Sequence, residues 1–189
     1  RRIVERLNKL GHKVRIGSRS ADLPFDWNDP TNWDEVLEGI DKVYITYQPD
    51  LAVPGAKEAI LELVKQAKKA GVSKMVLLSG KGEREAELCE DIVVSSGIDY
   101  TIIRASWFNQ NFSENFLLEP ILDGVVALPQ ANVKIPFVDA EDIADVAVKV
   151  LNDNSYNGKI FELTGSETLT FKEAIAVIAK ATNRSISFI

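Results

Sequence analysis

The chain has 189 residues, of which 46% are hydrophobic and 26% are charged, and its formal net charge at pH 7 is −6. Its mean hydropathy is −0.04 and its pI is near 5.0. This composition is typical of a globular chain with one core, and its acidic balance argues against direct nucleic-acid or anionic-membrane partners. One cysteine, Cys89, and one histidine, His12, are too few for a zinc site, so we expect no metal. No apolar run reaches the ~20 residues of a membrane span and no signal-peptide pattern is present, so we expect a cytoplasmic protein.

Short apolar runs alternate with amphipathic segments along the chain, which is the pattern of a parallel sheet covered by helices on both faces. The predicted strands cover residues 12–17, 23–27, 42–48, 74–79, 100–104 and 159–164. The predicted helices cover residues 1–10, 31–37, 52–70, 83–95, 140–151 and 171–181. We therefore predict a doubly wound, mostly parallel sheet of the α/β class.

The opening residues read as the middle of a helix, because no capping residue precedes Arg1. In a doubly wound sheet the first strand is central and pairs with the strands predicted at 12–17 and 42–48. We therefore expect the natural chain to begin earlier, with a strand and a Gly-x-x-Gly-x-x-Gly turn that are absent here. In this chain the two strands should flank a gap about one strand wide on each side rather than pair with each other.

Several segments, in their order and spacing, resemble the NmrA-like branch of the atypical short-chain dehydrogenases. They are GHKV at 11–14, FDW at 25–27, VLLSG at 76–80, SGIDYTIIRASWFNQNF at 96–112, PFVDAEDIA at 136–144, and FELTG at 161–165 followed by LTF at 169–171. The resemblance covers essentially the whole chain and implies an NAD(P)-binding Rossmann fold with a small C-terminal substrate lobe. It assigns residues 1–106 to the Rossmann core and 107–189 to the substrate side, with 136–165 returning to the core. Members of this family usually continue beyond Ile189.

The resemblance places the dinucleotide across the carboxyl ends of the strands, where a doubly wound sheet forms its crevice. Arg19 stands where an NAD-preferring protein would carry Asp or Glu, and a guanidinium there can grip a 2′-phosphate, so we expect NADP, with NAD as the alternative. Asp26 and Trp27 can contact the adenine. The full set of predicted cofactor-binding residues is Ser18, Arg19, Asp26, Trp27, Tyr47, Gln48, Pro49, Ser79, Gly80 and Arg104. The structural alternatives are a solvated surface arginine, a turn aspartate, a core tryptophan and residues that merely end a strand.

The substrate side is expected around residues 106–116, where aromatic side chains alternate with amides. Trp107, Phe108, Asn111 and Phe112 are the predicted substrate-binding residues, because an apolar pocket with a few polar groups suits a small molecule. Trp107, Asn111 and Phe112 should face a concavity bordered by Ser79 and Lys81. The alternative is an ordinary lobe interface.

Related dehydrogenases commonly use Tyr-x-x-x-Lys to pass a proton to the substrate oxygen, and no such pair occurs in this chain. Ser79 remains at the usual serine position, and Lys81 is close enough in sequence to act as a substitute acid, so these two are the predicted catalytic residues. Two functions stay open. One is an NADPH-dependent oxidoreductase for a small quinone, enone or carbonyl compound. The other is a non-catalytic redox sensor that binds the dinucleotide and signals to a regulatory protein partner. The expected partners are a small-molecule substrate and either a regulatory protein or a second copy of the chain in a homodimer.

Overall fold

A computed structural model describes residues 1–129 and 132–189 of the chain, which divides into two compact units. Unit 1 comprises Arg1–Arg104 and Ala144–Glu162, and unit 2 comprises Ala105–Ile143 and Leu163–Ile189. The predicted division at residue 106 is close to the first of these boundaries. The units are described separately below.

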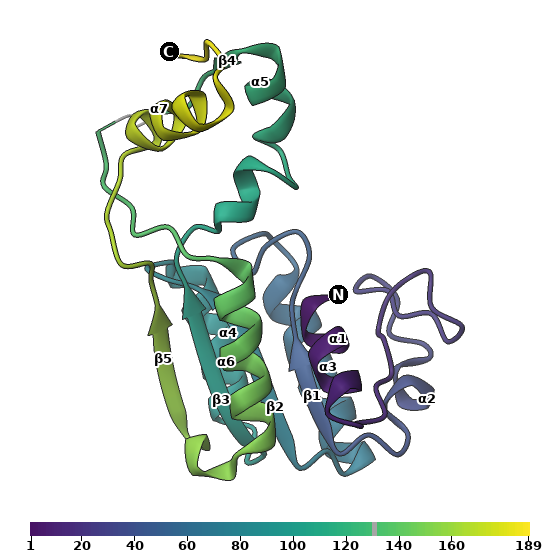
Figure 1. The fold of residues 1–189 in the computed structure, drawn as a ribbon. Coiled ribbons are helices and arrows are strands. Elements are labelled where there is room, and N and C mark those ends of the chain that lie inside the picture. Colours follow the sequence, from purple (N-terminus) through teal and green to yellow (C-terminus); the bar gives the residue numbers. More distant parts are fainter. Residues whose placement is uncertain (130–131) are drawn as a thin grey trace. The chain divides into compact units, whose positions relative to one another are not determined.

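Unit 1 is built on a sheet with the strand order β1-β2-β3-β5 (Figure 1). The strands are β1 (Lys42–Ile45), β2 (Lys74–Gly80), β3 (Asp99–Ala105) and β5 (Lys159–Leu163). β1 and β2 are parallel, with Lys42 opposite Lys74 and Ile45 opposite Leu77. Apolar β2 is almost fully buried, as expected for an inner strand of a parallel sheet. The strands predicted at 42–48, 74–79, 100–104 and 159–164 are therefore confirmed, although the first ends three residues early.

Helices cover both faces of this sheet (Figure 1). Helices α3 (Ala56–Ala70) and α4 (Arg84–Val94) lie on one face, and α1 (Arg2–Lys9) and α6 (Ala140–Asn152) lie on the other. The short helix α2 is Trp33–Leu37. The α3 and α4 side chains pack on the sheet in one apolar core that includes Ile60, Cys89, Met75 and Ile102. None of the helices in the described residues has the length and apolar character needed to cross a membrane.

The strands predicted at 12–17 and 23–27 are wrong for this chain, because neither segment forms a strand. A strand requires a neighbour for its backbone groups, and the edge strand β1 pairs only with β2. Residues 12–17 are instead held through Arg15, which donates to the carbonyls of Val36 at 2.7 Å and Glu38 at 2.8 Å, at the end of α2. The β-structure that residues 23–27 form is limited to an isolated bridge between Asp26 and Asp29.

The amino edge of the sheet is tied to the last turn of α6 by two lysines. The buried Lys74 donates to the carbonyls of Val150 at 2.5 Å and Asp153 at 3.2 Å, and Lys42 donates to that of Leu151 at 2.9 Å. The carbonyls of Val150 and Leu151 lie in the last turn of α6, where helix carbonyls lack an intrahelical partner, and Asp153 directly follows the helix; cations are favoured at this end of the helix dipole. Burial and the neighbouring Lys42 lower the pKa of Lys74.

Unit 2 has its own aromatic core and a small parallel sheet of β4 (Val125–Val126) and β6 (Ser187–Phe188). Its helices are the 3-10 helix η1 (Asn109–Phe112), α5 (Leu118–Asp123) and α7 (Phe171–Thr182), and a second 3-10 helix, η2 (Asn154–Tyr156), belongs to unit 1. Phe112, Phe137 and Phe171 contact one another edge to face and fill the centre of unit 2. A capping box of Thr170 and Glu173 fixes the start of α7 at the predicted residue.

Candidate functional site

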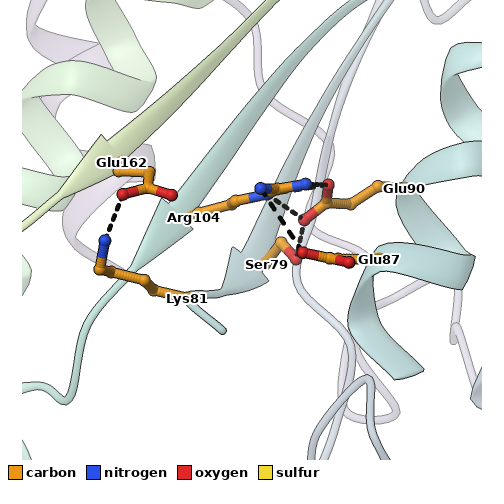
Figure 2. A network of polar contacts seen from close by, with 6 residues as sticks. All are labelled: Ser79, Lys81, Glu87, Glu90, Arg104 and Glu162. Atoms are coloured by element: carbon orange, nitrogen blue, oxygen red, sulfur yellow. Dashed lines mark hydrogen bonds and ion pairs between the residues drawn. The ribbon is translucent and has the colours of Figure 1, made fainter. Parts of the chain in front are cut away.

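Charged side chains of unit 1 gather at the carboxyl edge of the sheet, as Figure 2 shows. β2 brings Ser79 to this edge, with Lys81 directly after the strand, while β3 brings Arg104 and β5 brings Glu162. Because parallel strands end at the same edge, residues that are far apart in sequence meet there. Two of them, Ser79 and Lys81, are the predicted catalytic residues.

Glu90 of α4 is the centre of this group, although only 2% of its surface is exposed. The guanidinium of Arg104 binds its carboxylate with Nε at 3.0 Å from both oxygens and Nη2 at 2.7 Å from Oε2. Ser79 Oγ donates to Oε1 of the same carboxylate at 2.6 Å. The hydrogen bonds to Glu90 raise the pKa of Arg104, so the buried carboxylate faces a permanent cation. Glu87, one turn earlier in α4, lies 3.6 Å from Nη1 of Arg104.

Lys81 pairs with Glu162 rather than with the Glu90 group (Figure 2). The Lys81 ammonium lowers the pKa of the Glu162 carboxyl by hydrogen bonding and by its charge, and Arg104 adds to the effect. The Lys81 side chain is 37% exposed and that of Glu162 is 50% exposed, so solvent or a ligand can reach this pair. The arrangement leaves an ammonium at the edge that can present a proton to a bound molecule.

Glu83 is a further carboxylate at this edge. It precedes the first turn of α4, and its carboxyl lies so close to Gly80 that a Cβ at that glycine would collide with it. Burial raises the pKa of Glu83, and the charges of Asp50 and Glu85 add to the effect. A side chain at Gly80, a predicted cofactor-binding residue, would therefore require the flexible Glu83 side chain to move.

The predicted nucleotide side is built around three aromatic rings. The Trp27 ring lies 4.8 Å from both Phe25 and Tyr47, measured between centroids, so Trp27 and Tyr47 form one apolar wall. Asp26 closes a local turn, because its carboxylate accepts from the backbone of Asn28 at 2.9 Å. Gln48 and Pro49, joined by a cis peptide bond, follow Tyr47 and are exposed.

The loop before this wall carries Ser18 and Arg19. The carbonyl of Ser18 accepts from the backbone of Phe25 at 2.9 Å, which connects the loop to the aromatic rings. Arg19 is exposed and makes no ion pair within the described residues. An exposed guanidinium suits the 2′-phosphate of NADP, and an aromatic wall suits its adenine. The residues present are therefore compatible with this cofactor.

The four predicted substrate-binding residues all belong to unit 2. Trp107 is 41% exposed and its ring packs edge to face on Phe171, whereas Phe112 is 8% exposed and lies in the unit's core. Phe108 and Asn111 are half-buried. Trp107 and Asn111 thus have side-chain surface to offer a ligand, while Phe112 packs against Phe137 and Phe171 in the core.

Sequence reasoning missed the acidic half of the carboxyl-edge group. Glu87, Glu90 and Glu162 have no motif of their own, and Glu90 is one of several acids on an amphipathic helix. The available signal was positional: Glu90 follows Ala86 at a spacing of four and precedes Val93 by three, so it lies on the buried face of α4. A buried acid requires a partner, and Arg104 was the cation available on a buried strand.

A family model described as the NmrA-like family matches residues 23–189. The chain belongs to the NmrA-like family. It therefore has the NAD(P)-binding, Rossmann-like fold of the atypical short-chain dehydrogenases, and the predicted family and fold class are confirmed.

Several named proteins resemble this chain in sequence. Prestalk A differentiation protein A of Dictyostelium discoideum is 31% identical over 97% of this chain and 60% of its own length. An uncharacterized oxidoreductase of Bacillus subtilis is 29% identical over 100% of this chain and 69% of its own. The NAD(P)H azoreductase of Xenophilus azovorans is 26% identical over 87% of this chain and 59% of its own. The chain thus spans about three fifths to two thirds of these relatives.

Solved structures show the same fold. An NADPH-dependent quinone oxidoreductase of Escherichia coli in complex with NADPH has a TM-score of 0.72, with 23% identity, over 98% of this chain and 65% of its own. A nucleoside-diphosphate-sugar epimerase of Staphylococcus aureus has a TM-score of 0.80, with 18% identity, over 100% of this chain and 75% of its own.

Proposed function

We propose that the protein is an NADPH-dependent oxidoreductase that reduces a small quinone, enone or carbonyl compound. The observation that carries the proposal is the group of Ser79, Lys81 and Arg104 at the carboxyl edge of the unit 1 sheet. The family contains an NAD(P)H azoreductase, and the fold is shared with an NADPH-dependent quinone oxidoreductase. Both relatives reduce conjugated or quinoid molecules according to their names, which supports the same substrate class here.

The dinucleotide would be bound by unit 1. Arg19 would pair with the 2′-phosphate, Asp26 would accept from the adenine amino group, and Trp27 with Tyr47 would form the apolar wall. The remaining residues proposed to line the cofactor are Ser18, Gln48, Pro49, Ser79, Gly80 and Arg104. Trp107, Phe108, Asn111 and Phe112 of unit 2 are the residues proposed for the substrate.

A bound NADPH supplies the hydride. The substrate carbon accepts that hydride, and its oxygen then requires a proton, so the product gains two hydrogens in all. We assign the proton to the Lys81 ammonium, and Glu162 stays beside Lys81 as its counter-ion until solvent returns the proton. This assignment replaces the absent Tyr-x-x-x-Lys pair.

The proposal is tested by following the loss of NADPH absorbance with a panel of quinones, enones and simple carbonyl compounds. At least one quinone or enone should be reduced by the wild type. Lys81→Met should lower kcat about 100- to 10,000-fold, the contribution typical of one positioned acid, and leave the Kd for NADPH nearly unchanged. Lys69→Met, an exposed lysine on α3, is the matched control and should behave as wild type. Absence of turnover across the panel contradicts an oxidoreductase of this substrate class.

The second candidate is a redox sensor that binds the dinucleotide and changes its surface toward a protein partner. The observation in its favour is that Ser79 and Lys81 are both already bound to carboxylates. In addition, the sequence has no Tyr-x-x-x-Lys pair to supply a proton. A sensor should show no turnover and a marked difference in Kd between NADPH and NADP⁺. An enzyme should turn over, whatever that difference is.

A further inference from the structure

The hydroxyl of Ser79 donates its hydrogen bond to a residue of unit 1, Glu90. Its Oγ lies 2.6 Å from Oε1 of Glu90, and because a carboxylate only accepts, the hydroxyl is the donor (Figure 2). We propose that Glu90 holds Ser79 as a hydrogen-bond acceptor, and that Ser79 binds an N–H or O–H group of the dinucleotide rather than the substrate carbonyl. This inference rests on the proposed function, because it takes the dinucleotide as the ligand.

The Ser79 proton stays with Glu90 because of where that carboxylate lies. Glu90 is 2% exposed, so bulk solvent has little access to replace a lost donor. A hydrogen bond to a charged acceptor is roughly twice as strong as one between neutral groups. Turning the hydroxyl toward a substrate carbonyl would exchange the stronger bond for the weaker and leave Oε1 of Glu90 with Arg104 Nε as its remaining donor among the described residues. Arg104, which binds both carboxylate oxygens, keeps Glu90 in place.

The Ser79 Oγ atom can also accept hydrogen bonds through its lone pairs. A serine hydroxyl accepts through two lone pairs, yet no residue in the described ranges donates a hydrogen bond to this oxygen. Ser79 is 4% exposed, and the next two residues, Gly80 and Lys81, become progressively more exposed as β2 reaches the sheet edge. A ligand donor at this edge would complete the hydrogen bonding of a buried oxygen.

The chemistry of the two proposed ligands decides which of them Ser79 can bind. Quinones, enones and simple carbonyl compounds offer acceptor oxygens at the reacting centre and no donor. The nicotinamide half of the dinucleotide offers donors, namely the carboxamide N–H₂ and the ribose hydroxyls. Ser79 therefore positions the cofactor, and the proton for the substrate comes from another group, such as Lys81.

The first test compares wild type with Ser79→Ala in titrations with NADPH and with its 3-acetylpyridine analogue, in which a methyl ketone replaces the carboxamide. The Kd for NADPH should rise about 3- to 10-fold in Ser79→Ala, as for the loss of one neutral hydrogen bond. If the carboxamide is the donor, the analogue should bind both proteins equally. If a ribose hydroxyl is the donor, the analogue should lose the same factor as NADPH. A loss confined to NADPH supports an acceptor serine, whereas an equal loss supports it only if reduction of the acetyl group of the analogue to an alcohol leaves that loss unchanged.

The second test concerns Glu90 as a positioning residue. In Glu90→Gln the acceptor of the Ser79 proton is neutral, so the hydroxyl is freer to turn and donate. The ratio of the analogue's Kd to that of NADPH should therefore fall by at least about 2-fold when the carboxamide is the donor. If it is a ribose hydroxyl, both affinities should fall together. Glu87→Gln is the matched control, because Glu87 approaches Arg104 but does not contact Ser79, and it should keep the wild-type values.

Other binding results would contradict either the role of Ser79 alone or the proposed function as a whole. A wild type that binds NADPH no better than Ser79→Ala does, or a Ser79→Ala variant whose only defect is a higher KM for the substrate, overturns this inference and leaves the proposed function standing. A wild type that binds neither NADPH nor NADH overturns the proposed function and this inference with it. The Ser79→Ala test decides the case even if Glu90→Gln does not fold.

Discussion

The two edges of the unit 1 sheet satisfy their charges in different ways. At the amino edge, the cations Lys42 and Lys74 donate to backbone carbonyls at the end of α6. At the carboxyl edge, Arg104 and Lys81 are held by the carboxylates of Glu90 and Glu162. Lys74 is 1% exposed, whereas the carboxyl-edge cations keep about a fifth to a third of their side-chain surface exposed.

The difference separates charges that support the fold from charges that are available for function. A backbone carbonyl is present whatever the side chain, so the lysine that donates to it has a constant structural role. A cation paired with a carboxylate side chain can instead bind a ligand, because the carboxylate can move away or share the cation. The cations at the carboxyl edge are therefore the ones available for ligand binding. Changing the residues at each edge tests whether this distinction holds.

The largest expected effect is at the carboxyl edge, on the free energy of unfolding. Arg104→Met should lower it by about 3 to 5 kcal/mol, because the buried Glu90 then lacks its cation. The double variant Arg104→Met/Glu90→Met should recover most of that loss, since an apolar pair of similar volume replaces the ion pair. Urea unfolding of the three proteins measures both values. A double variant no more stable than Arg104→Met would show that Glu90 is not the partner that matters.

The amino edge should show a smaller loss without a comparable rescue. Lys74→Met should lower the free energy of unfolding by about 2 kcal/mol, because the carbonyls of Val150 and Asp153 lose a charged donor. The depressed pKa of Lys74 indicates that removal of the buried charge offsets part of the loss. Binding of NADPH should be unaffected, in contrast to Ser79→Ala. Lys69→Met serves as the exposed control, and a change in cofactor affinity in Lys74→Met would contradict the separation of the two edges.

Arg19 extends the comparison to a cation with no ion-pair partner among the described residues. If it grips a 2′-phosphate, NADPH should bind about 10- to 100-fold better than NADH, equivalent to a charged hydrogen bond of about 1.5 to 3 kcal/mol. Arg19→Asp should weaken NADPH and leave NADH unchanged or improved, and added salt should shrink the wild-type preference. Titration of both cofactors checks this. Equal affinities in wild type, or loss of both cofactors in the variant, would mean that Arg19 is a solvated surface residue that does not bind the 2′-phosphate.

Much of unit 1 was predictable because its elements carry local signals. Buried strands such as β2 are continuous apolar runs, and α3 ends at Gly71, whose φ of 80° suits glycine. The strand predicted at 12–17 failed for a non-local reason, since backbone pairing needs a neighbour that no pattern within the segment reveals. The two-residue strands of unit 2, β4 and β6, are too short to leave a periodic signal.

The candidate site was predictable only in part. The positions of Ser79 and Lys81 followed from the end of a predicted strand. Their partners did not, because Glu90 and Glu162 reach them only through the packing of α4 and the order of strands in the sheet. Sequence patterns locate residues on elements, whereas pairing between elements depends on the three-dimensional arrangement.

Glu83 provides the smallest and most specific test, because it is a carboxyl-edge acid with no ion-pair partner among the described residues. Burial, then Asp50 and Glu85, raise its pKa, so the folded state binds its proton more tightly than the unfolded state does. The stability that Glu83 contributes is therefore present at pH values below its unfolded pKa and is lost as the pH rises through the folded pKa. At pH 7 the charged form is unfavourable, even though the start of α4 favours a negative charge.

Glu83→Gln should consequently stabilise the protein at pH 7, by about 0.5 kcal/mol or less for a half-exposed group, and this gain should disappear as the pH falls below about 4. Thermal unfolding of wild type and variant between pH 3 and pH 8 measures the difference. Glu167→Gln, at an exposed loop position, is the control and should show no such trend. If Glu83→Gln instead destabilised the protein most at pH 7, the carboxylate would have a cationic partner, and Glu83 would belong with Glu90 and Glu162 among the paired acids of the carboxyl edge.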